Sequence, residues 1–155
     1  MRIKVLAVGK KMPGWVQAGW AEYHKRLPKE VKLALIEIAP GNRGKSSSAA
    51  TAMKEEAARM LAAIEPTDTV IALDVKGRNW STEQLAENIA SWQMDGLQIA
   101  LLIGGPDGIA PELLAQAKQR WSFSNLTLPH PLVRVVLVEQ IYRAFSLLNN
   151  HPYHK

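Results

Sequence analysis

The hydrophobic pattern switches between strand-like and helical segments along the whole chain. Short apolar runs, such as TVIALDV at residues 69–75, are apolar on both faces, as in the strands of a parallel sheet. Between these runs, apolar residues recur every three or four positions, as on the buried face of a helix. The pattern predicts strands at 2–8, 31–39, 69–75, 97–103 and 121–126, and helices at 13–27, 46–64, 81–92, 111–118 and 132–148.

Strands and helices alternate five times, which predicts one α/β domain over residues 1–155 with a mostly parallel sheet. Ligands in such sheets bind where the strands end. Those ends are Leu73–Asp74, the glycine-rich stretch 104–108 and residues 123–128. The G-x-G-x-x-G fingerprint is absent, so we do not expect a dinucleotide cofactor.

The last 35 residues, 121–155, hold the most unusual pattern. Pro129 and Pro131 flank His130 and make a stiff bend, in which the histidine is either a base or only a turn residue. The helix that follows is apolar almost all round, so it must be buried on most sides, and we expect a second subunit to cover it. Glu139 and Arg143 are spaced to pair along it, which fits a structural salt bridge as well as a functional site.

Composition removes several classes of protein. The chain has no cysteine, which excludes disulfides, thiolate zinc sites and cysteine nucleophiles. No run of 18 apolar residues is present, so no membrane span is expected. The start, MRIKVLAVGKKMPGW, lacks a small-residue cleavage site and is better explained as a strand than as a signal peptide, which favours a cytoplasmic location. His151 and His154 are separated by Pro152, which prevents a helical ligand face, so no metal is expected.

Positive charge is concentrated near the N-terminus. The net charge is +5, but residues 1–45 hold ten Lys and Arg against three Glu, a net +7. A localised basic surface is typical of nucleic-acid binding, although a solubilising surface would explain it as well. The candidate phosphate contacts are Lys10, Lys11, Lys25, Arg26, Arg43 and Lys45.

A competing pattern lies at Ala39–Ser46, APGNRGKS, which fits a loosened P-loop with alanine in place of the first glycine. The strand ending at Asp74 would then hold magnesium, as in an NTPase. Pro40 weakens this interpretation, because it removes a backbone N–H where the phosphate cradle would begin. A third alternative is a ribosome-binding module without catalytic activity.

Several motifs together resemble one known family. They are LLIGGPDG at 101–108, SFSNLTLPHPLVRVVLVEQIYRAF at 122–145 and NNHPYHK at 149–155, with AVGKKMP, residues 22–26 and the RGK loop. The chain resembles the RlmH family of SPOUT-class methyltransferases over essentially its whole length. The resemblance implies an α/β knot fold with a deep C-terminal trefoil knot, and a homodimer packed through the last helix. It also implies S-adenosylmethionine-dependent methylation of N3 of a pseudouridine in 23S ribosomal RNA, on the assembled ribosome.

The resemblance also implies roles for particular residues. It implies that His130 contacts the substrate. It also implies that the catalytic residues are Arg143, Tyr153 and His154. His154 or Tyr153 would take the N3 proton, and Arg143 would stabilise the anion that forms. The implied cofactor contacts are Leu73, Gly104, Gly105, Phe123, Ser124, Asn125, Leu126, Thr127 and Leu128.

Overall fold

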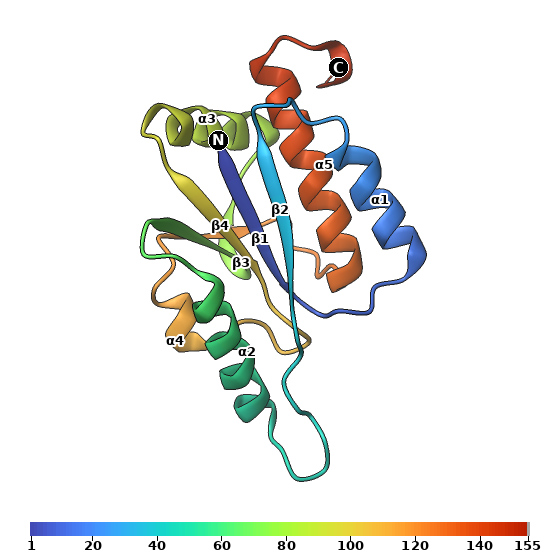
Figure 1. The fold of residues 1–155 in the computed structure, drawn as a ribbon, viewed down its shortest axis with the longest axis vertical. Helices are drawn as coiled ribbons and strands as arrows, with labels where there is room; N and C mark the ends of the chain where they lie inside the picture. The colour runs from blue at the N-terminus through green and yellow to red at the C-terminus, as the bar shows by residue number, and fades with distance from the viewer. Residues whose placement is uncertain (155) are drawn as a thin grey trace.

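The computed structural model describes residues 1–154, without the side chain of His154. Its centre is a sheet of five parallel strands in the order β2-β1-β4-β3-β5 (Figure 1). The predicted α/β class is therefore confirmed, and the sheet is parallel throughout. The strands are β1 (Arg2–Val8), β2 (Lys32–Ile38), β3 (Asp68–Asn79), β4 (Gln98–Ile103) and β5 (Gln119–Ser122).

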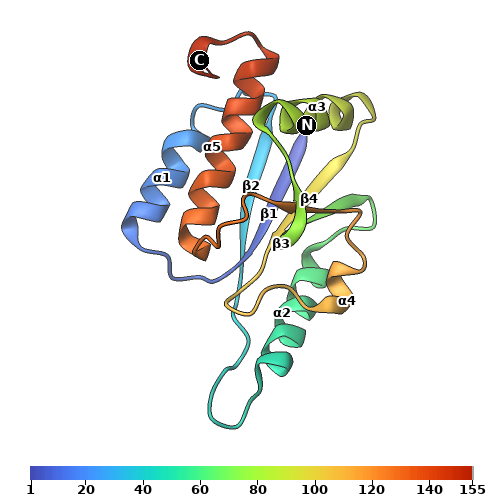
Figure 2. The ribbon, with the colours of Figure 1, turned by 180° about the vertical axis from the view of Figure 1, so that it is seen from behind.

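Helices cover both faces of the sheet (Figures 1 and 2). Helices α1 (Gly14–His24), α3 (Thr82–Met94) and α5 (His130–Leu148) lie on one face, and α2 (Ala49–Ala63) and α4 (Pro111–Leu114) on the other. Successive side chains of a strand point to opposite faces. In β1, Ile3 and Val5 therefore join the cluster with α3 and α5, and Leu6 and Val8 join the cluster with α2 and α4. This burial on both faces explains why β1 and β4 have almost continuous apolar runs.

Two helix starts follow directly from serines. Ser81 and Gln84 form the capping box expected from their spacing: the Ser81 Oγ accepts from the Gln84 N–H at 3.0 Å, and the Gln84 Oε1 accepts from the Ser81 N–H at 2.8 Å. At α2 the cap is Ser48, whose Oγ accepts from the Thr51 N–H at 3.1 Å. Ser48 is one of the serines at 46–48 that were expected to cap this helix, and α2 therefore begins at Ala49.

The sequence prediction was wrong in detail between residues 111 and 126. Helix α4 ends at Leu114, and β5 ends at Ser122, so residues 123–126 are not a strand. The chain joins the sheet early because the Lys118 N–H donates to the Val70 carbonyl at 2.9 Å. Strand β3 also continues past residue 75, with a shift in its pairing with β5 at Leu73–Arg78. Gly77 lies at that shift, where a Cβ atom would be 2.6 Å from the Arg120 carbonyl carbon.

Helix α5 begins at His130, two residues earlier than expected, with Pro129 as its N-cap. Its buried side packs Leu137, Ile141 and Ala144 into the core. Arg134, a charged residue of this helix, is only 1 % exposed, whereas Leu132 is 37 % exposed. Within the described residues, no helix is both long and apolar enough to cross a membrane.

Candidate functional site

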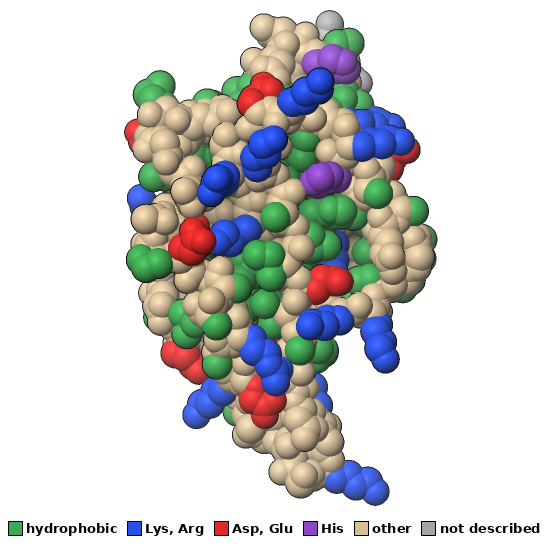
Figure 3. Space-filling model, viewed as in Figure 1, with side chains coloured by type: hydrophobic (Ala, Val, Ile, Leu, Met, Phe, Trp, Pro, Cys, Tyr) green, Lys and Arg blue, Asp and Glu red, His purple; other side chains and the backbone are tan. Residues whose placement is uncertain are grey.

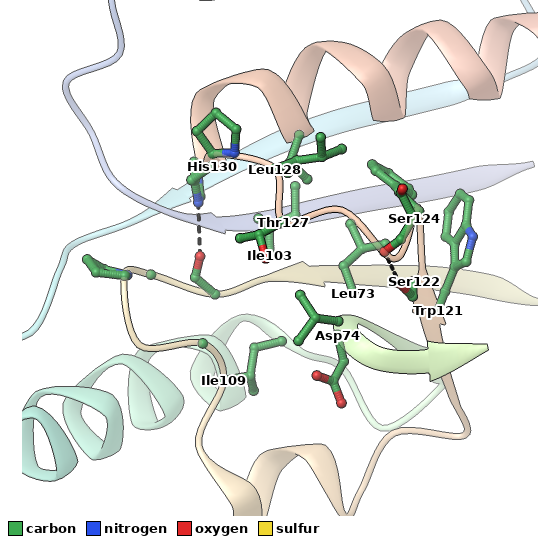
Figure 4. Close-up of a pocket in the computed structure, with 18 of the residues that line it drawn as sticks. Leu73, Asp74, Ile103, Ile109, Trp121, Ser122, Ser124, Thr127, Leu128 and His130 are labelled. Carbon is green, nitrogen blue, oxygen red and sulfur yellow. Dashed lines mark hydrogen bonds between the residues drawn. The ribbon is translucent and has the colours of Figure 1, made fainter. Parts of the chain in front are cut away.

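A cavity of about 400 Å³ lies at the ends of β4 and β5, beside the middle of β3 (Figure 4). This volume is in the range of small-molecule sites. Its walls come from three segments that are far apart in sequence: Leu73–Val75, residues 103–109 and residues 121–130. Eight of the nine residues proposed for cofactor binding line the cavity, namely Leu73, Gly104, Gly105, Phe123, Ser124, Leu126, Thr127 and Leu128. The ninth, Asn125, is not among the lining residues.

Residues 104–108, called here the cofactor loop, form a compact turn at one end of the cavity. A Cβ atom on Gly104 would lie 2.6 Å from the Gly108 carbonyl carbon, so the loop closes only because residue 104 is glycine. The Gly108 N–H donates to the Gly105 carbonyl at 3.0 Å, and Gly108 has a φ of +85°. These two glycines are therefore needed for the shape of the loop itself.

His130 lies between the cofactor loop and α5. Its Nδ1 lies 2.9 Å from the Gly104 carbonyl oxygen, and its Nε2 lies 2.8 Å from the Nε of Arg134. An arginine can only donate, so Nε2 accepts, and Nδ1–H donates to Gly104. The structure thus brings His130 to the cavity, but both of its ring nitrogens are already bonded in a neutral tautomer.

Arg134 completes this network, and the sequence analysis missed its importance. Besides His130, it donates from Nη1 to the Glu37 carboxylate at 2.7 Å and from Nη2 to the Gly9 carbonyl at 2.8 Å. Its guanidinium group therefore joins the ends of β1 and β2 to α5, and through His130 to the end of β4. A buried arginine with three partners is a structural centre of this edge of the sheet.

The bonding of His130 predicts a specific loss of stability in acid. Burial lowers the pKa of His130, and the charge of Arg134 lowers it further, against the opposing effect of the bond to Gly104. A histidine whose folded-state pKa is lowered stabilises the fold above its unfolded pKa of about 6.5 and loses that contribution as the pH falls below it. Urea unfolding should therefore give a free energy that declines below about pH 6.5. The decline should be shallower in His130→Asn, and an equally steep decline there would assign it to other groups.

A second cluster, called here the tail cluster, consists of Glu139, Arg143 and Tyr153. Arg143 donates from Nε and Nη2 to the Glu139 carboxylate at 2.9 and 2.5 Å, and the Tyr153 hydroxyl donates to the same oxygen at 3.0 Å. The Arg143 guanidinium also lies 4.8 Å from the centre of the Tyr153 ring. Burial raises the pKa of Tyr153 to about 12, with help from the Glu139 hydrogen bond. In this arrangement Tyr153 is a protonated phenol at neutral pH.

The tail cluster and the cavity lie at opposite ends of α5. Val133 lines the cavity, and Arg143 follows ten positions later, about 15 Å along the helix. The side chain of His154, the third catalytic candidate, lies outside the described part of the structure. One chain therefore does not bring the described catalytic candidates to the cofactor candidates.

The basic candidates fall into two groups. Lys10, Lys11 and Lys45 are exposed, and so are Lys25 and Arg26, which both pair with Glu22. Figure 3 shows Lys and Arg side chains spread from one end to the other of the viewed face. Arg43 differs from all of these: it is bonded to Glu56 and Asp107.

The loop between β2 and α2 does not act as a phosphate cradle. In a P-loop, free backbone N–H groups point at the phosphates. Here the Gly41 N–H donates to Glu56 at 2.9 Å, and the Asn42 N–H donates to Glu55 at 3.1 Å. Two carboxylates therefore use the N–H groups that a phosphate would need, which argues against the NTPase alternative.

A parallel α/β sheet with a cavity at its strand ends is typical of enzymes that bind a small cofactor. The family model described as "Predicted SPOUT methyltransferase" matches residues 1–154. The chain belongs to this SPOUT methyltransferase family, within the RlmH group.

Curated relatives of the RlmH group match the chain from end to end. Proteins named ribosomal RNA large subunit methyltransferase H are 52% identical in Pseudomonas aeruginosa and 54% identical in Marinomonas sp., each over 100% of both chains. A crystal structure of a putative methylase family protein from Neisseria gonorrhoeae superposes with a TM-score of 0.55 at 12% identity, covering 91% of this chain and 81% of that one. At this identity the structural likeness supports the fold alone.

Proposed function

We propose that this protein transfers a methyl group from S-adenosylmethionine to N3 of a pseudouridine in 23S ribosomal RNA. It is an rRNA methyltransferase, as its SPOUT family membership and its full-length relatives indicate. The finer assignment of cofactor, base and atom is our inference. The observation that carries it is the cavity at the strand ends, formed by the residues that the family resemblance assigns to the cofactor.

The lining of the cavity fits S-adenosylmethionine. Apolar side chains such as Leu73, Ile103 and Ile109 offer a slot for a flat base, and Asp74 is the only carboxylate among the lining residues. A carboxylate suits a ligand that carries a positive sulfonium and an ammonium group. When bound, this cofactor supplies an electrophilic methyl group.

The tail cluster provides the groups for the base to be methylated. The N3 proton of the pseudouridine must leave, and an imide is mostly protonated at neutral pH. Arg143 would stabilise the negative charge that develops on the base. His154 would accept the proton, or Tyr153 would do so as a phenolate after its own hydroxyl proton has passed to water. Burial and the bond to Glu139 oppose that loss, because they raise the pKa of Tyr153 to about 12. We therefore favour a rearrangement of the tail when RNA binds.

The distance between the tail cluster and the cavity supports a homodimer. A second hollow of about 300 Å³ shares Trp121 and Phe123 with the cavity and is also lined by Val136 and Gln140 of α5. With the exposed Leu132, these α5 residues form a stripe that has room for a second copy. An antiparallel pairing of two α5 helices would place one tail beside the cavity of the partner.

Calorimetric titration with S-adenosylmethionine tests the proposal, with ATP and magnesium as the control. Binding of S-adenosylmethionine alone is the expected result, and a methyl-transfer assay on ribosomes that lack the modification would follow. Binding of ATP alone would overturn the proposal. If neither ligand binds, even with ribosomes present, a ribosome-binding module without catalysis becomes the better description.

Asp74 should discriminate between the cofactor and its demethylated product. S-adenosylmethionine carries a sulfonium charge that S-adenosylhomocysteine lacks, so a nearby carboxylate favours the former. We expect Asp74→Asn to weaken S-adenosylmethionine binding roughly fivefold, or about 1 kcal/mol. Product binding should weaken less, because the product keeps the ammonium group but not the sulfonium charge. Calorimetry with both ligands measures this ratio. Equal weakening of both would mean that Asp74 shapes the cavity without acting through its charge.

Ribosomal RNA binding should weaken steeply with salt if the exposed lysines contact phosphates. Each phosphate contact adds about 0.7 to 0.9 to the slope of log affinity against log salt concentration. Replacing Lys10 and Lys11 together with glutamine should therefore lower the slope by about 1 to 2. Filter binding at several salt concentrations gives the slope. If the RNA affinity of the native protein does not depend on salt, the basic segment is only a solubilising surface. Other contacts would then hold RNA to the homodimer, which we place in the cytoplasm.

A further inference from the structure

The outer side of the cofactor loop is held by an ion-pair network that the proposed function does not use. This network, called here the Arg43 clamp, consists of Arg43, Glu56 and Asp107. Arg43 donates from Nη1 and Nη2 to the two carboxylate oxygens of Glu56 at 2.6 and 3.1 Å, and from Nε to Asp107 at 2.9 Å. Asp107 belongs to the cofactor loop, whereas Arg43 lies on the loop between β2 and α2.

The buried member of the clamp is Glu56, whose side chain is 4% exposed. Its carboxylate also accepts from the Gly41 N–H, and it packs against Gly105, where a Cβ atom would lie 3.2 and 3.3 Å from its oxygens. The bidentate bond fixes the plane of the Arg43 guanidinium group. Its Nε therefore points at Asp107 without further ordering of the side chain. An exposed ion pair alone contributes little, but this one is pre-organised by a buried partner.

The cofactor loop is thus bonded on two sides. On the inner side, His130 donates to the Gly104 carbonyl, and Gly104, Gly105 and Gly108 face the cavity. On the outer side, Glu56 lies behind Gly105 and Arg43 bonds Asp107. Asp107 itself is not among the residues that line the cavity. A change in the clamp can therefore reach a ligand in the cavity only through the position of the loop.

We propose that Arg43 is a positioning residue, which holds the cofactor loop in its binding conformation through Asp107 and does not contact RNA phosphate. This role rests on the proposed function, because the ligand that benefits is S-adenosylmethionine. Arg43 lies two residues before the exposed Lys45 on the same loop.

Asp107→Asn and Arg43→Lys test the clamp while leaving the buried Glu56 paired or hydrogen-bonded. Both should weaken S-adenosylmethionine binding by about fivefold or more. Asp107→Asn should leave the unfolding midpoint unchanged, whereas Arg43→Lys should lower it, because lysine cannot make the bidentate bond to the buried Glu56. The double variant should be no weaker than either single one, because both remove the same contact. Lys45→Gln is the matched control: it removes one charge from the same loop and should leave S-adenosylmethionine affinity unchanged while weakening RNA binding.

Amide hydrogen exchange separates this inference from the proposed function, because it needs no ligand. The amides of residues 104–109 should exchange about tenfold faster in Asp107→Asn than in the native protein, and Lys45→Gln should not change them. Unchanged exchange and unchanged cofactor affinity in both clamp variants would overturn the clamp. If the native protein does not bind S-adenosylmethionine at all, the proposed function fails, and the clamp is then decided by hydrogen exchange alone.

Discussion

Arg143→Ala is expected to lower the rate of methyl transfer by roughly two to three orders of magnitude. Other enzymes lose about this much when a group that stabilises developing charge is removed. The cause would be loss of the cation that bonds Glu139 in the tail cluster of Glu139, Arg143 and Tyr153. The cofactor cavity lies at the other end of α5, so S-adenosylmethionine affinity should stay the same. Single-turnover methylation of unmodified ribosomes, beside calorimetry on the same preparation, measures both quantities.

Arg143→Lys is the matched variant for this experiment. It keeps the positive charge but cannot make the same two-nitrogen contact with Glu139. We expect intermediate activity from it, because the charge is retained with poorer geometry. Native activity in Arg143→Ala, with a normal unfolding midpoint, would remove Arg143 from the catalytic group and leave it as part of a structural salt bridge.

Arg134→Met should destabilise the fold by about 3 kcal/mol, because the buried acceptors on Gly9 and His130 would each lose a charged donor. For a chain of this length, that loss lowers the unfolding midpoint by about 10 °C. Thermal unfolding followed by circular dichroism measures the change. Cofactor affinity should fall as well, since His130 would no longer be held against the Gly104 carbonyl.

The control for this second experiment is Arg120→Met, which removes an exposed arginine from β5. A surface change of this kind is usually worth less than about 0.5 kcal/mol. If Arg134→Met lowers the midpoint no more than Arg120→Met does, the buried network of Arg134 adds little to stability.

The sequence predicted β1 and β4 well because these two central strands are buried on both faces and have nearly continuous apolar runs. Helices α2 and α3 begin after Ser48 and Ser81, with the expected capping geometry. The prediction failed at β5, because residues 123–129 are irregular and their polar groups bond locally: the Ser122 Oγ donates to the Ser124 carbonyl, and the Ser124 Oγ accepts from the Leu126 N–H. Such local bonds leave no periodic pattern to detect.

For the candidate site, the resemblance located the cavity, but the ion pairs could not be predicted. A hydrophobic pattern counts every arginine as a polar surface residue. It therefore does not single out Arg134, and it leaves Arg43 as a candidate phosphate contact. Their partners lie far away in sequence: Glu37 is 97 positions from Arg134, and Asp107 is 64 positions from Arg43. Only the folded chain shows that the two charges are already bonded to carboxylates.

The contact between Arg134 and Gly9 joins positions that are 125 residues apart, and β1 pairs with β4 across almost a hundred residues. During synthesis, the first strand therefore emerges long before its central neighbour and before the helix that ties its end. The central sheet cannot close until most of the chain is available, because contacts between distant residues form late. Folding of this protein should be largely a post-translational event, with β1 and β2 exposed to chaperones until α5 has left the ribosome.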